Sequence, residues 1–277
     1  AFFHITWDDP TRSLRHLPLV REEQGWRVRE DGFHRFDEQR FYEDKFALML
    51  ADNCDPGGSR STWLGPRPLD HKPPNWHGKG YHYTNDGTTR DIWHWKAVRT
   101  NDMYLADDNF FGAPDDVRSG RRRYTAGYLP DAKESGGYVM NWQWYSPNGV
   151  LPQRLPKEAS QLEPYQQPDG AGADWVIPWY GYQRYDGAQD HYLPGTVMPS
   201  VIYISNRFEG DRADVQARAV WGNGRWSLEL VRPLDTGSPH DVALKPGVCL
   251  WVAAFDHAQI AHTRHARPLR LGFGEGQ

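Results

Sequence analysis

The strongest constraint on the fold lies near residue 220, where two alternating segments flank a short turn. Apolar and polar residues alternate from Val215 to Trp221 and again from Arg225 to Leu230. Between them, Gly222-Asn223-Gly224 contains an Asn-Gly pair, which is typical of a two-residue β-hairpin turn because both residues tolerate a positive φ. This part of the chain is therefore predicted to be a pair of antiparallel strands.

Other apolar segments predict further strands, whereas helix signals are scarce. Lys45–Leu50 and Val197–Ile204 have the composition of strands, the second with Pro199 near its start. Val248–Phe255 is apolar on both faces, as expected for a central strand buried between two layers. Residues 53–74 and 146–174 are rich in Pro, Gly, Asp and Gln and are expected to be long loops.

These patterns predict an all-β fold: a single β-sandwich with long loop insertions and little helix. The chain contains no internal repeat and no shift of composition that would mark a domain boundary. We therefore expect residues 1–277 to form one domain.

Composition excludes several classes of protein. Mean hydropathy is −0.80, yet 14% of the residues are aromatic, including 13 Trp, and disordered chains lack aromatic residues. The longest apolar run, Val248–Phe255, is far shorter than the roughly 20 residues of a membrane span. A net charge of −4 gives no electrostatic basis for binding nucleic acid. A chain with few aliphatic and many aromatic residues suits the wall and lid of a pocket for a flat, apolar cofactor.

Motifs that carry chemistry narrow the field further. The chain has no nucleophile elbow, no phosphate-binding loop, no H-E-x-x-H zinc motif and no C-x-x-C-H for covalent haem attachment. Cys54 and Cys249 are too few for a Cys-based zinc site, and spacing alone leaves open whether they form a disulfide. The sequence starts at Ala1 without Met, as a mature chain does after signal removal, so a periplasmic or otherwise exported location is expected.

Histidines are the remaining candidates for a metal site, and the chain has 12 of them. A single histidine is more often a surface or hydrogen-bonded residue than a ligand, so a site needs two that converge. His77 and His82 flank a Gly-rich segment, and His257, His262 and His265 follow the last apolar strand. These two regions are the expected sources of a ligand pair.

Three segments resemble one protein family: Trp7–Pro10, Asp91–Ala97 and Val252–His265. They are similar to the haem-binding domain of the gamma subunits of ethylbenzene dehydrogenase and dimethyl sulfide dehydrogenase, and of related periplasmic cytochromes. The similarity extends over most of the chain and is best in residues 79–99 and 248–273. This resemblance implies a β-sandwich that holds one non-covalent b-type haem in a pocket formed by loops at its edge.

The resemblance also implies the axial ligands of the haem iron. In the gamma subunits a Met before the Trp-x-Trp-Lys strand and a Lys after the penultimate strand bind the iron; here His82 and His265 occupy those places. A haem with two histidine ligands is six-coordinate and has no open site, so it transfers electrons without activating a substrate. His77 and His262 stay open as replacements, because each lies close in sequence to a proposed ligand.

Charged residues near these segments have further candidate roles. Lys96 ends the Trp-His-Trp-Lys strand and Arg99 follows it, and both are candidates for pairing with the haem propionates. The alternative is that they are exposed strand cations. Asp107–Asn109 and Asp115–Asp116 offer oxygen ligands for calcium, although they lack the spacing of an EF-hand loop.

The sequence-based hypothesis is an exported b-type cytochrome that carries electrons and does not turn over a substrate of its own. Its expected partner is a redox protein or a membrane cytochrome, with a molybdenum oxidoreductase as a further candidate. The main alternative is a carbohydrate-binding β-sandwich module that stacks sugars on exposed aromatic residues, drawn from Trp142–Tyr145, Trp175 and Trp179–Tyr180. A glycoside hydrolase is a weaker alternative, because no pair of carboxylates stands out.

Overall fold

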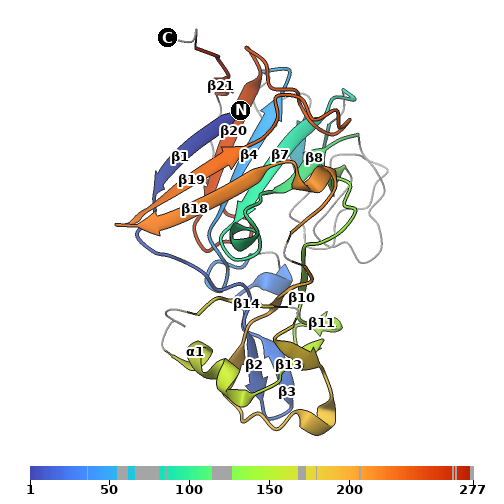
Figure 1. Cartoon of the computed structure of the whole chain (residues 1–277), viewed down its shortest axis with the longest axis vertical. Helices are drawn as coiled ribbons and strands as arrows, with labels where there is room; N and C mark the ends of the chain where they lie inside the picture. Colours follow the sequence, from blue (N-terminus) through green and yellow to red (C-terminus); the bar gives the residue numbers. More distant parts are fainter. Residues whose placement is uncertain are drawn as a thin grey trace.

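A β-sandwich forms the larger part of the computed structural model (Figure 1). The structure describes residues 1–35, 37–54, 62–65, 81–84, 86–113, 127–167, 173–178, 180–205, 207–263, 265 and 267–274. A six-stranded antiparallel sheet packs against a three-stranded antiparallel sheet, which confirms the predicted all-β class. The six-stranded sheet has the order β21 (Leu269–Arg270), β20 (Cys249–Phe255), β4 (Lys45–Ala51), β7 (Arg90–Lys96), β8 (Asp107–Phe111) and β9 (Tyr128–Pro130). The three-stranded sheet has the order β1 (Phe2–Asp8), β19 (Arg225–Val231) and β18 (Gln216–Gly222).

The hairpin predicted near residue 220 is present as β18 and β19. Trp221 pairs with Trp226, and the two turn residues between the strands have positive φ angles, 53° at Asn223 and 72° at Gly224. Such a turn matches the right-handed twist of the flanking strands. Local sequence therefore specified this element and its register.

Tryptophan rings fill much of the space between the two sheets. Trp7 lies 5.9 Å from Trp95 and 6.2 Å from Trp226, measured between ring centroids, and Trp93 is also buried in this core. Each of two indole nitrogens finds a polar partner: Trp95 donates to Asn101 and Trp226 donates to Asp44. Much of the aromatic excess thus serves the sandwich core, which the expected role as a cofactor wall and lid did not anticipate.

A second, smaller group of sheets lies below the sandwich in Figure 1 and has its own hydrophobic core. One sheet has the order β11 (Trp144–Ser146), β12 (Gly149–Leu151), β3 (Gly25–Val28), β2 (Leu19–Glu22) and β16 (Val197–Met198). The others comprise β10 (Tyr138–Met140), β17 (Val201–Tyr203) and β14 (Val176–Ile177), and the pair β13 (Arg154–Pro156) and β15 (Tyr182–Arg184). The chain thus contains two hydrophobic cores, and the single domain expected for residues 1–277 stays a prediction.

Two expectations for this region were wrong in detail. Residues 146–174 do not form one long loop, because they contain β12, β13 and the short helix α1 (Glu163–Gln166). The strand expected over Val197–Ile204 is divided at Pro199 into β16 and β17, which belong to different sheets. Proline has no N–H to donate, so it interrupts a ladder of hydrogen bonds. The 3-10 helices are η1 (Phe33–Arg35), η2 (Asn101–Met103), η3 (Ala159–Leu162), η5 (Gly187–Gln189) and η6 (Asp211–Ala213).

The segment between β4 and β7 contributes a hairpin of β5 (Thr62–Gly65) and β6 (Tyr81–Thr84). The backbone N–H of Thr84 donates to the carbonyl of Gly112 at 2.8 Å, which joins β6 to the end of β8. Within the described part of the chain, no helix is long and apolar enough to cross a membrane.

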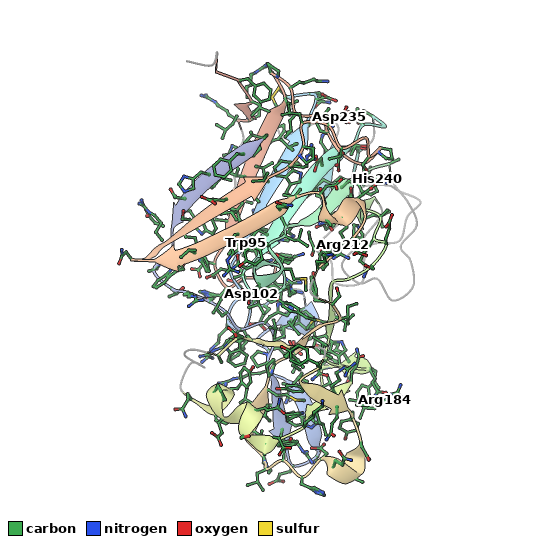
Figure 2. The ribbon with its side chains drawn as sticks, in the orientation of Figure 1. Trp95, Asp102, Arg184, Arg212, Asp235 and His240 are labelled. Carbon is green, nitrogen blue, oxygen red and sulfur yellow. A yellow bond between two sulfur atoms is a disulfide. The ribbon has the colours of Figure 1, made fainter. Side chains whose placement is uncertain are left out.

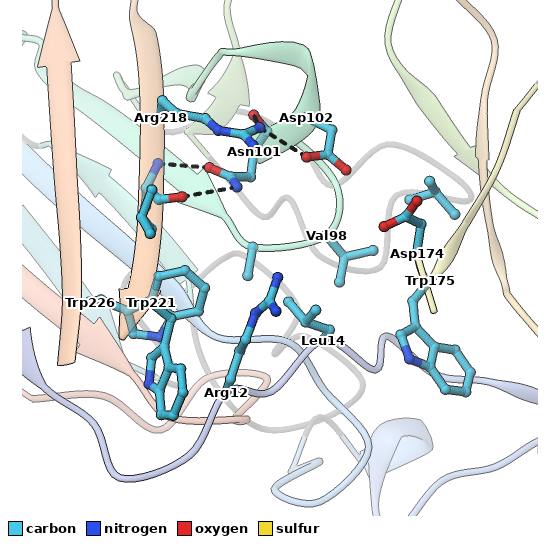
Figure 3. Close-up of a pocket in the computed structure, with 14 residues that line it drawn as sticks. Arg12, Leu14, Val98, Asn101, Asp102, Asp174, Trp175, Arg218, Trp221 and Trp226 are labelled. Atoms are coloured by element: carbon cyan, nitrogen blue, oxygen red, sulfur yellow. Dashed lines mark hydrogen bonds and ion pairs between the residues drawn. The ribbon is translucent and has the colours of Figure 1, made fainter. Parts of the chain in front are cut away.

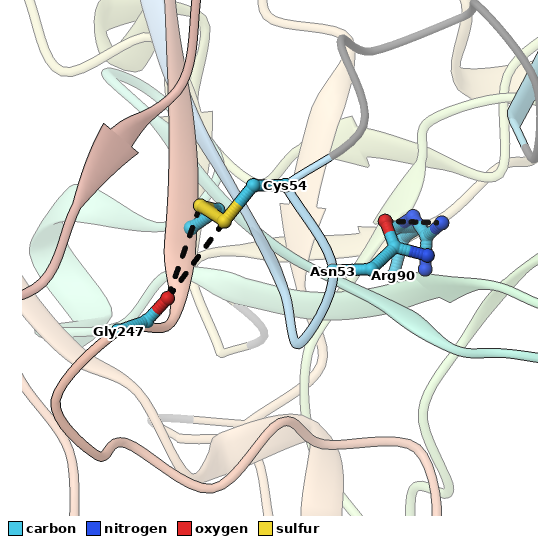
Figure 4. The surroundings of a disulfide bond; sticks show 5 residues. Asn53, Cys54, Arg90 and Gly247 are labelled. Carbon is cyan, nitrogen blue, oxygen red and sulfur yellow. Dashed lines mark hydrogen bonds between the residues drawn. A yellow bond between two sulfur atoms is a disulfide. The ribbon is translucent and has the colours of Figure 1, made fainter.

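A disulfide joins Cys54 to Cys249, which answers the question that their spacing left open (Figure 4). The Cα atoms lie 5.3 Å apart, and the bond links the residues after β4 to the first residue of β20. Beside it, Arg90 donates to the side-chain carbonyl of Asn53 at 3.2 Å. One end of the six-stranded sheet is therefore tied covalently across 195 residues of sequence.

Candidate functional site

The six-stranded sheet has an inner face toward the three-stranded sheet and an outer face that points away from it. Leu48 and Trp93 belong to the sandwich core, so their alternating neighbours lie on the outer face. On the three central strands these outer-face residues include Ala47, His94 and Ala253, which stay only half-buried. Small side chains in the middle of a sheet leave room for a flat group to lie against it.

Two ring nitrogens on the outer face have no partner within the described part of the chain. No hydrogen bond from the described residues reaches Nε2 of His94 or Nε1 of Trp251. His94 lies 5.6 Å from the ring of Phe255, measured between centroids, so aromatic edges flank the alanines. Buried polar atoms without a partner are uncommon in proteins, and an absent ligand is one reason for them. The outer face thus fits an apolar, planar group that accepts a hydrogen bond from a ring nitrogen or packs against a ring.

His265 lies at the edge of β20, next to this face. Its Nε2 accepts a hydrogen bond from the N–H of Val252 at 3.0 Å, and its Nδ1 lies 2.6 Å from the carbonyl of Arg267. An acceptor role for Nε2 and a carbonyl opposite Nδ1 together fit the tautomer that carries its proton on Nδ1. This is the arrangement of a metal-binding histidine, in which a backbone carbonyl orients the ring and Nε2 keeps its lone pair. Ligation would require Nε2 to leave Val252.

The other histidines proposed as ligands are placed less completely. The backbone of His82 lies in β6 and pairs with Leu64, while its side chain and the whole of His77 lie outside the described residues. His262 is exposed, its Nδ1 lies 2.6 Å from the carbonyl of Thr263, and its ring is 4.8 Å from that of Phe255. Nδ1 of each ring faces a backbone carbonyl, so this contact does not separate the two histidines, and the choice between His262 and His265 stays a prediction.

Lys96 and Arg99 are buried, so the alternative that they are exposed strand cations is wrong. Lys96 is 4% exposed and forms an ion pair with Asp107, and Arg99 is 3% exposed and forms one with Glu43. Burial alone would raise the pKa of Asp107, but Lys96 and Arg212 outweigh it and hold that pKa well below its usual range. Both cations already have carboxylate partners inside the protein, and their contact with haem propionates stays a prediction.

Comparison with known protein families identifies one match over almost the whole chain. A family model described as ethylbenzene dehydrogenase matches residues 1–267. The chain belongs to the ethylbenzene dehydrogenase family. This confirms the resemblance inferred from the Trp-His-Trp-Lys strand and the closing segment. None of the curated proteins searched matches the chain.

This member of the ethylbenzene dehydrogenase family also has a pocket of about 280 Å³, which lies away from the outer face of the six-stranded sheet (Figure 3). Asp102 and Arg218 of the sandwich region line one side, and Asp174 and Trp175 line the other. Ligand pockets typically enclose roughly 300 to 1,000 Å³. His265, Lys96 and Arg99, the predicted haem residues whose side chains the structure describes, do not line this pocket.

The aromatic residues proposed as a sugar platform do not share one exposed surface. Trp144 is 53% exposed and Tyr180 is 64% exposed, but Trp175 is buried at 5%. Trp175 instead packs against Tyr165 with a centroid distance of 5.1 Å, and Trp179 lies outside the described residues. Trp175 is therefore not available for stacking on a sugar, which weakens the alternative of a carbohydrate-binding module.

The grouping of Asp107, Asp108 and Asn109 into one calcium site is wrong. These residues are consecutive on β8, so their side chains alternate between the two faces of the sheet. Asp107 is engaged by Lys96 and Arg212, whereas Asp108 lies near Asp91. Asp115 and Asp116 lie outside the described residues.

The sequence did not indicate the buried acids that form ion pairs with Lys96 and Arg99. Glu43 accepts hydrogen bonds from the backbone of Val98 and Arg99 and also lies 3.0 Å from Nδ1 of His16. Its only local signal is the run of charges Glu43-Asp44-Lys45 directly before an apolar strand. Such a run normally indicates a solvated loop, and here it is entirely buried.

The burial of His94 predicts how the free energy of unfolding depends on pH. Burial lowers its pKa well below the usual value, and the charges of Lys96 and Lys45 lower it further. The folded protein therefore keeps His94 neutral, while the unfolded chain binds a proton below about pH 6.5. Stability is expected to fall by about 1.4 kcal/mol per pH unit below that point, or about 2 kcal/mol between pH 7 and pH 5.

Urea unfolding of the wild type and of His94→Gln at both pH values measures this contribution. Other groups titrate equally in the two proteins, so their effects cancel in the difference. An equal loss of stability in both proteins would show that His94 is not held neutral.

Proposed function

We propose that the chain binds one non-covalent b-type haem and transfers electrons, as a carrier or as a subunit of an oxidoreductase complex. The observation that carries this proposal is the match of the ethylbenzene dehydrogenase family model over residues 1–267. The outer face of the sheet supports it, since small residues, aromatic edges and two ring nitrogens without a partner among the described residues suit a flat, apolar cofactor. Haem supplies one-electron chemistry when bound.

His265 and His82 are the proposed axial ligands. His265 supports this role with a ring that is already oriented through Nδ1 by Arg267. His82 follows from its place before the Trp-His-Trp-Lys strand and from the position of its backbone in β6. Two imidazoles would leave no open position on the iron, which favours electron transfer over catalysis.

The proposed partner is a redox protein or a membrane cytochrome, and a molybdenum oxidoreductase is one candidate complex. The proposed location is the periplasm or another compartment outside the cytoplasm. The disulfide supports an exported protein, because such bonds persist in oxidising compartments and are rare in the cytosol.

A visible absorption spectrum of the purified protein tests the proposal. We expect a Soret band with sharp alpha and beta bands on reduction, and release of the haem by acid-acetone because no C-x-x-C-H attaches it. A colourless protein that does not take up haemin would contradict the proposal.

Substitution of each proposed ligand tests its role separately. His265→Ala and His82→Ala are each expected to convert the six-coordinate, low-spin spectrum to a high-spin one or to abolish haem binding. His262→Ala and His77→Ala are the matched controls and are expected to keep the low-spin spectrum. An unchanged spectrum in His265→Ala, with a changed one in His262→Ala, would move the ligand to His262.

A further inference from the structure

Four aspartates gather inside the sandwich, away from the outer face, around a single guanidinium. Asp91 on β7 and Asp108 on β8 are fully buried, Asp131 after β9 is 3% exposed, and the side chain of Asp241 is 3% exposed. Arg232 forms ion pairs with Asp91 and Asp241. One arginine does not balance four carboxylates, and burying uncompensated charge costs several kcal/mol per group.

The strands bring these residues together in a defined way. Asp91 pairs with Phe110 and Trp93 pairs with Asp108, so both aspartates lie on the inner face of neighbouring strands. Asp241 comes from the loop between β19 and β20, which also holds His240, stacked on Phe110 at 4.0 Å. Figure 2 shows His240 on the side of the sandwich next to β8. Segments far apart in sequence thus converge at one point.

The hydrogen bonds of the cluster separate its oxygens into two sets. Oδ2 of Asp91 accepts from Arg232 and from the N–H of Val242, and Oδ2 of Asp241 accepts from Thr236 at 2.6 Å. These donors hold the carboxylates in place. No hydrogen bond from the described residues reaches Oδ1 of Asp91, Oδ1 of Asp241 or either oxygen of Asp108.

Asp108 is the observation that points most directly to a ligand. It is completely buried and aimed at its acidic neighbours, and both of its oxygens lack a donor among the described residues. Asp131 is also buried, and its carboxyl lies against that of Asp241. Almost all buried polar groups in proteins are satisfied, and an absent ion is one explanation for a group that is not.

The spacing of the oxygens suits a calcium ion. One ligand oxygen from each of Asp91, Asp108 and Asp241 lies within 4.8 Å of the other two. Calcium binds oxygens at roughly 2.3 to 2.6 Å, so two of its ligands lie up to about 5 Å apart. Magnesium requires shorter bonds, near 2.1 Å, and usually keeps several waters, which a buried site does not favour. Zinc prefers nitrogen and sulfur ligands, whereas these three side chains offer only oxygen.

We propose that Asp91, Asp108 and Asp241 form a buried calcium site, with Asp131 as an additional acidic neighbour. The ion would compensate the charge that Arg232 leaves unbalanced, and it would tie β7 and β8 to the loop between β19 and β20. The site lies on the inner face of the sheet, so it is independent of the proposed haem site on the outer face.

Calcium analysis of the purified protein, followed by titration of the EDTA-treated protein with CaCl₂, tests this site. We expect one calcium ion per chain, and a Tm that rises by about 5 °C when calcium exceeds its Kd about 100-fold. Asp108→Asn is expected to lose this calcium-dependent shift. Asp235→Asn, an exposed carboxylate of the same loop, is the matched control and is expected to keep it.

A second measurement keeps the test decisive if Asp108→Asn does not fold. Terbium replaces calcium at oxygen sites and luminesces when a nearby indole transfers energy to it, and Trp93 contacts Arg232 of the cluster at 4.7 Å. We expect terbium luminescence in the wild-type protein that added calcium abolishes. Absence of bound calcium together with equal Tm values in EDTA and in calcium would overturn the proposal, as would binding of magnesium but not calcium.

Discussion

Replacing Cys54 and Cys249 by serine is expected to lower the free energy of unfolding by about 4 to 5 kcal/mol. The disulfide closes a loop of 195 residues, and the stabilisation by a cross-link grows with the length of the loop that it restricts in the unfolded chain. The bond also fixes the first residue of β20, a central strand of the larger sheet. Denaturant unfolding of the wild type and the double variant measures the difference.

Reduction provides the control for this prediction. Dithiothreitol is expected to lower the stability of the wild type to that of the double variant and to leave the variant itself unchanged. Two titratable thiols in the unreduced wild-type protein, or a stability difference below about 1 kcal/mol, would show that the bond does not stabilise the fold as expected.

Replacing Glu43 by glutamine is expected to lower the free energy of unfolding by about 3 to 5 kcal/mol. Glu43 is completely buried, pairs with Arg99 and His16, and accepts from two backbone N–H groups. Burial would raise its pKa, but Arg99 and then His16 outweigh that effect and hold the pKa well below its usual range. Glutamine keeps the size of the side chain and leaves the buried guanidinium of Arg99 uncompensated.

Glu22→Gln is the matched control, because it removes an exposed partner of the same chemistry. Glu22 lies 3.7 Å from Arg27, and about half of each side chain is exposed. Exposed pairs contribute about 0.2 to 1 kcal/mol, so this variant is expected to remain close to the wild type in chemical denaturation. Equal losses in the two variants would show that burial of the Glu43–Arg99 pair adds nothing to its effect.

The candidate haem site was predictable in part from sequence. The Trp-His-Trp-Lys strand and the closing segment indicated the family, which the family model confirms over residues 1–267. The sequence also named His265, whose ring lies beside β20. It did not indicate that Lys96 and Arg99 are buried, because their acidic partners Asp107 and Glu43 are joined to them only by tertiary contacts.

Strands with a local sequence pattern were predictable, because side chains along a strand alternate with a period of two residues. The hairpin of β18 and β19, the strand β4 and the central strand β20 each follow from alternation, turn chemistry or continuous apolar residues. The division of Val197–Ile204 at Pro199 and the second hydrophobic core were not predicted. Those features depend on which segments of the chain pair with each other.

The sequence by itself determined the all-β class, the hairpin and the family, because each is recognised from the residue pattern within individual segments. Only the tertiary structure decided the disulfide, whose cysteines are 195 residues apart, and the cluster of Asp91, Asp108 and Asp241. Asp108 and Trp93 share the inner face because β7 and β8 pair in this register, and no local pattern specified that pairing. Strand pairing and the packing of the loop between β19 and β20 bring these acids to one arginine, and both depend on contacts between distant segments of the chain.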